Sequence, residues 1–141
     1  MVGKAAEEDG IIKAGSLMIN AVSNRQVPAI SIFIGNSYGA GNYAMAGRSY
    51  APNFLFAWPN SKCSVMGAEQ LTNVMDIIAR QAAEKSNRPV NEEKLGMQKA
   101  ALQSIVDGES DAYFNTSRMQ DDGLIDPRNT RTVLGITLQI V

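Results

Sequence analysis

Two stretches of small residues could do chemistry through their backbone N–H groups. Residues 38–42 (YGAGN) and residues 65–68 (VMGA) each follow a run that predicts a strand. Each is predicted to lead into a helix, and the first N–H groups of a helix have no partner inside it. Two such groups aimed at one point can stabilise a developing oxyanion by about 3–4 kcal/mol in acyl transfer. The other interpretation, tight packing or a turn, stays open at this point.

The composition excludes most other catalytic chemistry. The chain has no histidine, which removes Ser-His-Asp triads, Cys-His dyads and histidine zinc sites. Its single cysteine, Cys63, excludes an internal disulfide and a CxxC metal knuckle. The 13 Lys and Arg residues nearly balance the 14 Asp and Glu residues, so we expect no nucleic-acid partner. A backbone oxyanion site requires none of the excluded side chains.

Other candidate sites favour structural interpretations. Residues 39–41 (GAG) lack the GxGxxG spacing of a dinucleotide fingerprint. Asp121, Asp122 and Asp126 could hold a hard cation, but their spacing favours a solvated turn, and we predict no metal site. Cys63 lies in a predicted strand with no base nearby, which favours a structural thiol over a nucleophile.

Short strands and helices must position the two glycine-containing stretches. Asp9 is predicted to cap a helix that runs to about Asn24, in which Gly15 packs closely against another backbone. Residues 29–34 predict a strand that is buried on both faces. A short helix is predicted over 43–48, and two further strands over 54–58 and 62–66.

The second half of the chain predicts helices. A long helix opens at residues 67–68, and its apolar face is formed by Leu71, Val74, Met75, Ile78 and Ala82. Asn91 followed by two acids predicts the start of another helix, which ends near Gly108. A last helix is predicted over 131–141. The alternation of strands and helices indicates an α/β fold.

The length of the chain is sufficient for one core. A compact protein of 15.2 kDa would expose about 7,000 Å². Because no apolar run reaches the roughly 20 residues of a membrane helix, we expect no membrane partner. We expect a cytoplasmic location by default, or the mitochondrial matrix in a eukaryote. Both ends lack a clear start or stop signal, so we expect a piece of a larger polypeptide.

Residues 34–48 (IGNSYGAGNYAMAGR) resemble the carboxyltransferase β subunit of biotin-dependent acyl-CoA carboxylases. The likeness is strongest to the methylcrotonoyl-CoA and geranyl-CoA carboxylase branch. It continues through residues 1–4 (MVGK), 10–15 (GIIKAG), 54–60 (FLFAWPN), 64–70 (SVMGAEQ) and 121–127 (DDGLIDP). The resemblance therefore covers essentially the whole chain.

The resemblance implies a crotonase-like (ClpP/crotonase) fold of layered ββα units. Residues 1–141 would form the C-terminal, biotin-side domain of a two-domain subunit. The family moves a carboxyl group from carboxybiotin, carried by a biotin carboxylase/biotin carrier subunit, to an acyl-CoA. The CoA-binding half of the carboxyltransferase comes from a neighbouring subunit, so the resemblance also implies a homo-oligomer.

Matched residue by residue, the resemblance assigns the oxyanion donors to the N–H groups of Ala40 and Gly41. It assigns the turn to Gly39. It places Tyr38, Gly67 and Ala68 along the biotin and substrate region. The residues of this motif resemble the branch that acts on branched, unsaturated acyl-CoA, so the resemblance implies a substrate of that class.

Two alternatives stay open. One is a noncatalytic fragment or degenerate paralogue that keeps the fold for oligomer assembly. The other is a crotonase-fold hydratase or isomerase, which requires carboxylate acid/base residues beside the junction. It ranks lower, because the first acid after Gly41 in the sequence is Glu69.

Overall fold

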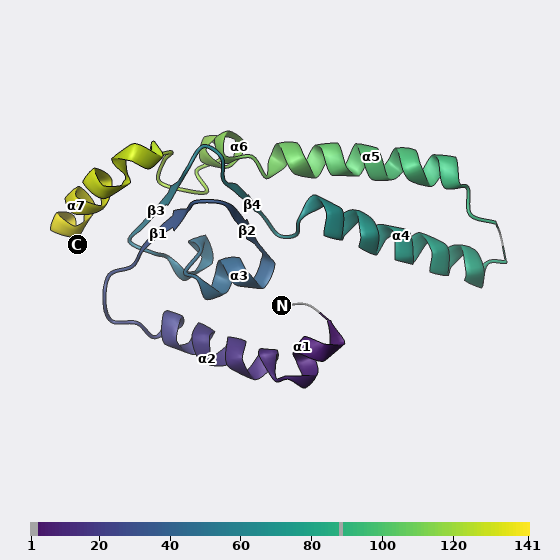
Figure 1. Ribbon diagram of the computed structural model, residues 1–141, viewed down its shortest axis with the longest axis horizontal. Helices are drawn as coiled ribbons and strands as arrows, with labels where there is room; N and C mark the ends of the chain where they lie inside the picture. Colours follow the sequence, from purple (N-terminus) through teal and green to yellow (C-terminus); the bar gives the residue numbers. More distant parts are fainter. Residues whose placement is uncertain (1–2, 88) are drawn as a thin grey trace.

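The computed structural model describes residues 3–87 and 89–141 and contains two successive strand–strand–helix units (Figure 1). The first unit is β1 (Ile30–Phe33), β2 (Asn36–Tyr38) and α3 (Gly39–Ala44). The second is β3 (Phe54–Ala57), β4 (Lys62–Ser64) and α4 (Ala68–Lys85). Met1 and Val2, the start of the MVGK motif, lie outside the described residues.

The two units stack through parallel strand pairs. β1 pairs with β3, with Ile30 opposite Phe54. β2 pairs with β4, with Tyr38 opposite Ser64. The polar segment of β2 was not predicted as a strand, because Asn36 and Ser37 carry no strand-forming side chains. Because β2 and β4 run parallel, α3 and α4 begin at the same end of this pair, where both strands have their carboxyl ends.

The other elements flank these units (Figure 1). Helices α1 (Lys4–Glu8) and α2 (Ile11–Ser23) precede β1, and the 3₁₀ turn η1 (Arg48–Tyr50) precedes β3. After α4 come α5 (Glu92–Glu109), α6 (Ala112–Ser117), the 3₁₀ turn η2 (Pro127–Asn129) and α7 (Thr130–Ile140). In the described part of the chain, no helix has the length and apolar character to span a membrane.

The core is centred on β3. Leu55 is completely buried, and Phe56 and Ala57 are nearly so. The chain around residue 122 covers the outer edge of this strand. The Asp122 N–H donates to the Leu55 carbonyl (2.7 Å), and the Asp122 carboxylate accepts from the Leu55 N–H (2.8 Å).

The acidic turn is less solvated than predicted. Asp121 is buried and accepts hydrogen bonds from the Thr116 hydroxyl (2.7 Å) and the Gly123 N–H (3.0 Å). Asp126 accepts from the backbone of Arg128 and forms an ion pair with its guanidinium group (2.6 Å). These carboxylates therefore hold the chain that covers β3.

Three local predictions for the N-terminal third are wrong. Every residue of β1 is half-buried, because no described strand pairs with its outer edge. No described atom lies within 4 Å of a methyl group built on Gly15, so this glycine does not serve close packing. Asp9 ends α1 and does not cap α2, which begins after Gly10 without a side-chain cap.

Helices α4 and α5 form a hairpin that extends away from the strands (Figure 1). The predicted cap of α5 is confirmed, since the Asn91 side chain accepts from the Lys94 N–H (2.9 Å). The apolar face predicted for α4 is not the face that packs on α5. Thr72 is buried, whereas Val74 and Ile78 on that apolar face are exposed.

The molecule exposes more surface than a compact body of its mass. Its accessible area is 9931 Å², roughly 40% above the 7,000 Å² expected from its mass. Large apolar side chains contribute to this surface, among them Ile12, Leu17, Ile77, Leu138 and Ile140. Several faces of the described structure therefore remain without an apolar partner.

Candidate functional site

The two glycine-containing junctions lie side by side. Each follows the carboxyl end of a strand in the parallel pair β2–β4, so both chains turn into their helices at one edge. A methyl group on Gly67 would lie 3.5 Å from Cε2 of Tyr38. The structure thus brings together Tyr38 and Gly67, which sequence analysis placed in one region.

Gly39 makes the first junction possible. Its φ of +54° is left-handed, a conformation that costs roughly 1–2 kcal/mol for a residue with a Cβ. A methyl group here would also meet the Val65 carbonyl oxygen at 3.2 Å. Gly39 therefore lets the β2–α3 turn lie directly against the loop that leads into α4.

Ala40 and Gly41 occupy the first turn of α3. The N–H groups of a first turn have no acceptor within their own helix, and no side chain caps α3. Ala40 is exposed, and Gly41 has open space where a side chain would be. Two first-turn N–H groups without an acceptor in their own helix therefore belong to residues with open space beside them, Ala40 and Gly41.

The second junction differs in its electrostatics. Helix α4 begins after Gly67, also without a side-chain cap, but it carries Glu69 in its first turn. An acid at this position interacts favourably with the helix dipole and opposes an incoming anion. No acid lies in the first turn of α3. The start of α3 is therefore the better place for developing negative charge.

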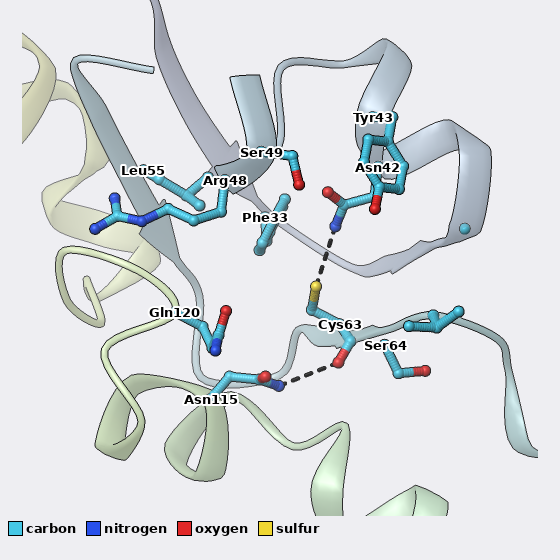
Figure 2. Close-up of a pocket in the computed structure, with 12 residues that line it drawn as sticks. Phe33, Asn42, Tyr43, Arg48, Ser49, Leu55, Cys63, Ser64, Asn115 and Gln120 are labelled. Carbon is cyan, nitrogen blue, oxygen red and sulfur yellow. Dashed lines mark hydrogen bonds between the residues drawn. The ribbon is translucent and has the colours of Figure 1, made fainter. Parts of the chain in front are cut away.

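Asn42 anchors α3 to the neighbouring strand (Figure 2). The side-chain amide of Asn42 donates to the Cys63 sulfur on β4 (3.1 Å). The backbone carbonyl of Asn42 accepts from the Gly47 N–H (2.9 Å). The Tyr43 carbonyl accepts from the Ala46 N–H (3.1 Å), which completes a Schellman-type helix end. Helix α3 is thus tied to β4 through Asn42 and closed at its C-terminal end.

Cys63 serves this anchoring role. Burial raises the pKa of its thiol, although the hydrogen bond from Asn42 lowers it in part. The group therefore remains a thiol near neutral pH and is a poor nucleophile, as the sequence indicated. On the other side of β4, the Asn115 side chain donates to the Cys63 carbonyl (3.2 Å).

A cavity of about 280 Å³ lies between α3, β4 and α6 (Figure 2). Gly39 and Asn42 form one wall, and Cys63 and Asn115 another. Arg48 also lines it and forms an ion pair with Asp122 (3.2 Å). Because a neutral amide, a thiol and a paired arginine form these walls, the cavity has no free acid or base.

Sequence analysis missed Asn42 and Asn115. Asn42 directly follows the glycine stretch, and it would have drawn notice as a polar side chain on an otherwise small-residue helix. Asn115 carried no signal, because helix α6 was not predicted. Neither partner of Cys63 is near it in the sequence.

Comparison with known proteins gives a consistent result. The carboxyl transferase domain family matches residues 1–141. The chain is 52% identical to the probable biotin-dependent acyl-coenzyme A carboxylase beta2 subunit of Mycobacterium tuberculosis, over 100% of this chain and 27% of that protein. It is 45% identical to the probable mitochondrial methylcrotonoyl-CoA carboxylase beta chain of Drosophila melanogaster, over 99% of this chain and 24% of that protein.

A solved structure agrees with these sequence matches. The beta subunit of P. aeruginosa geranyl-CoA carboxylase superimposes with a TM-score of 0.88 at 43% identity. The match covers 99% of this chain and 26% of that chain. The chain thus spans about a quarter of the length of its relatives.

Proposed function

The chain belongs to the carboxyl transferase domain family, and on that basis we propose that it forms the biotin side of an acyl-CoA carboxylase's carboxyltransferase site. Its fold is the crotonase-like fold of the carboxyltransferases, in ββα units. The observation that carries the proposal is the uncapped start of α3, with Ala40 and Gly41 presented by the Gly39 turn.

The residues at this start fit a neutral, polar group such as the biotin ureido ring. The turn presents N–H donors, carries no acid and has no side chain at Gly39 or Gly41 to block approach. Bound carboxybiotin would supply the carboxyl group, and its ureido oxygen gains negative charge as that group leaves. The N–H groups of Ala40 and Gly41 would stabilise this charge.

Rigid support makes such donors effective. Gly39 lets the turn lie close to the Val65 carbonyl, and the hydrogen bond from Asn42 to Cys63 ties α3 to β4. Donors fixed before the reaction need no reorganisation when charge develops, which is the source of electrostatic catalysis. Tyr38, Gly67 and Ala68 would line the approach to these donors.

The names of the relatives support a substrate class. One is a probable methylcrotonoyl-CoA carboxylase and another a geranyl-CoA carboxylase, so both act on branched, unsaturated acyl-CoA thioesters. We extend this class to the present chain. A biotin carrier subunit, the CoA-binding half of the carboxyltransferase and further copies of the subunit would complete the enzyme.

A mutation of one donor tests the proposal. The matched quarter of the P. aeruginosa geranyl-CoA carboxylase beta subunit is replaced by this chain, and geranyl-CoA carboxylation is measured in the assembled enzyme. Gly41→Pro removes one N–H in the first turn of α3, where that group has no acceptor within the helix. We expect a fall in rate of about 10²-fold or more.

Gly41→Ala is the matched control. It keeps the N–H and adds a methyl group into open space, so activity should stay within a few-fold of the unsubstituted chimera. Full activity of a folded Gly41→Pro chimera would place the donors elsewhere. If that variant misfolds, Ala40→Pro removes the other donor. An unsubstituted chimera that assembles without activity would favour the noncatalytic alternative.

A further inference from the structure

Helix α3 is too short to hold its own position. It has six residues, none of them buried, and no side chain caps its start. Isolated helices of fewer than about 12 residues are marginal in water, so the place of α3 depends on contacts with its neighbours. A group that ties α3 to a strand therefore also sets where the N–H groups of Ala40 and Gly41 lie.

The Asn42 side chain has a contact at each end of its carboxamide. The nitrogen donates to the Cys63 sulfur on β4 (Figure 2). The oxygen fills the space beside Gly47, because a methyl group built on Gly47 would overlap this oxygen. The same methyl group would lie 2.7 Å from the backbone carbonyl oxygen of Asn42. The carboxamide therefore lies between β4 and the loop that follows α3, and Gly47 leaves the room for it.

Cys63 is a fixed anchor for this hydrogen bond. Its N–H donates to the Ser110 carbonyl at the end of α5 (2.9 Å), and its carbonyl accepts from the Asn115 side chain on α6 (3.2 Å). It also lies opposite Ser37 in the parallel pair of β2 and β4. Because both backbone groups of Cys63 are held, its sulfur accepts from a defined place in the fold.

Other side-chain contacts of α3 are less specific. The Tyr43 ring meets the Tyr50 ring edge-on, with 6.2 Å between centroids, but Tyr50 belongs to the turn η1 and gives no link to a strand. Among the described residues, the bond from Asn42 to Cys63 is the one side-chain hydrogen bond that joins α3 to a strand. A hydrogen bond has a preferred direction, whereas apolar contacts have none, so this bond sets the orientation of the helix.

We propose that Asn42 and Cys63 act as a positioning pair for carboxyl transfer, through the orientation of α3. This inference rests on the proposed function, because the pair acts through the N–H groups of Ala40 and Gly41. A misplacement of about 1 Å can cost roughly 10²-fold in rate. Neither side chain of the pair contacts the substrates, so its loss slows the transfer step and leaves the binding of acyl-CoA unchanged.

Steady-state kinetics of the geranyl-CoA carboxylase chimera test the pair. We expect Asn42→Ala to lower kcat about 10-fold with the KM for geranyl-CoA unchanged, the pattern of an interaction that counts only in the transition state. Cys63→Ala removes the acceptor and should have the same effect. The double variant should be no slower than either single variant, because all three lose the same bond. Cys63→Ser keeps an acceptor at this position and should retain kcat within about 3-fold.

Thr130→Val is the matched control. It removes another half-buried hydrogen bond between neutral side chains, from the Trp58 indole N–H to the Thr130 hydroxyl (3.1 Å), at the start of α7. This variant should lose stability as Asn42→Ala does, measured by thermal unfolding, but its kcat should stay within about 2-fold of the unsubstituted chimera. An equal fall in kcat in both variants would reduce the role of Asn42 to general stability and overturn the proposal.

Three further outcomes would overturn the pair. They are an unchanged kcat in folded Asn42→Ala, a raised KM with kcat unchanged, and single effects that multiply in the double variant. If Asn42→Ala does not assemble, Cys63→Ala and Cys63→Ser decide the question, because they change only the acceptor. Full activity of Asn42→Ala beside an inactive Gly41→Pro would remove the pair and keep the proposed donors. Full activity of Gly41→Pro would remove both.

Discussion

Gly39 and Gly15 show how differently one residue type can act. Gly39 combines a left-handed φ of +54° with a position where an added methyl group would lie a tight 3.2 Å from the Val65 carbonyl oxygen. Gly15 lies inside helix α2 with open space around it and a φ outside the left-handed region. Only the first has a conformational requirement for glycine.

Alanine substitutions should therefore change stability in opposite directions. We expect Gly39→Ala to lower the free energy of unfolding by about 1–2 kcal/mol, since left-handed backbone disfavours a Cβ. Gly15→Ala should raise it by about 0.5–1 kcal/mol, because alanine is the better helix residue. Urea denaturation of the two variants measures both. A stabilised Gly39→Ala protein would contradict the geometry of the β2–α3 turn.

The sequence could single out candidate positions only where they form a contiguous motif. Residues 38–42 were identified because a run of small residues begins just after the strand predicted over 29–34, and residues 67–68 because they follow the strand predicted over 62–66. The hydrogen bond from Asn42 to Cys63 joins residues 21 positions apart and depends on the β2–β4 register, so no local pattern could indicate it. Gly15 fitted the predicted helical stripe equally well, and only the folded neighbours show that nothing packs there.

At the scale of the elements, charge pairs join the α4–α5 hairpin. The Arg80 guanidinium contacts Glu92 on α5 (2.8 Å) and Asp76 on its own helix (3.1 Å). Lys99 on α5 also contacts Asp76 (2.8 Å). Hydrogen bonds from Lys99 and Arg80 lower the pKa of Asp76, and the bond from Arg80 lowers that of Glu92.

This network predicts acid sensitivity of the hairpin. A carboxyl group whose pKa is lowered by folding adds stability above its unfolded pKa and loses it as the pH falls through the folded value. We expect helicity to begin to fall below about pH 4, the ordinary range of Asp and Glu. Circular dichroism during acid titration measures this loss.

Arg80→Gln should weaken the pH dependence, and Lys94→Gln serves as its control. Lys94 lies in the first turn of α5 and makes no ion pair among the described residues, so its removal should leave the acid transition unchanged. Equal transitions in both variants would show that the network does not hold the hairpin. Arg80 and Glu92 are exposed, and Asp76 and Lys99 are half-buried, so added salt should reduce the effect in part.

Elements with a strong local signal were predictable, and those that depend on the fold were not. Helix α5 has a capping asparagine and two acids, and it begins where expected. Helix α7 was also predicted within a residue of its observed start. Strand β2 was missed because it exists through its pairing with β4. Helix α6 was missed although its cap by Asp111 is a local signal, because the helix has only six residues.

At the scale of the whole molecule, exposed surface is the dominant property. The accessible area of 9931 Å² and the exposed apolar side chains show that large apolar surfaces lie open among the described residues. The composition gave no sign of this, since it is typical of a globular domain. The difference lies in where the apolar residues are placed, which only the fold reveals.

These surfaces lead to a prediction for the isolated chain. The proposed donors lie on this chain, whereas the CoA-binding half of the carboxyltransferase is proposed to lie on a neighbouring subunit. We expect the 141-residue protein to show negligible carboxyl transfer from carboxybiotin to geranyl-CoA or methylcrotonoyl-CoA, at least about 10³-fold below the assembled chimera, because a reaction between two bound groups requires both to be positioned. The assay follows carboxylated acyl-CoA by mass spectrometry, with the chimera measured in parallel. Turnover by the isolated chain near that of the chimera would mean that one quarter of the relatives' length holds a complete carboxyltransferase site.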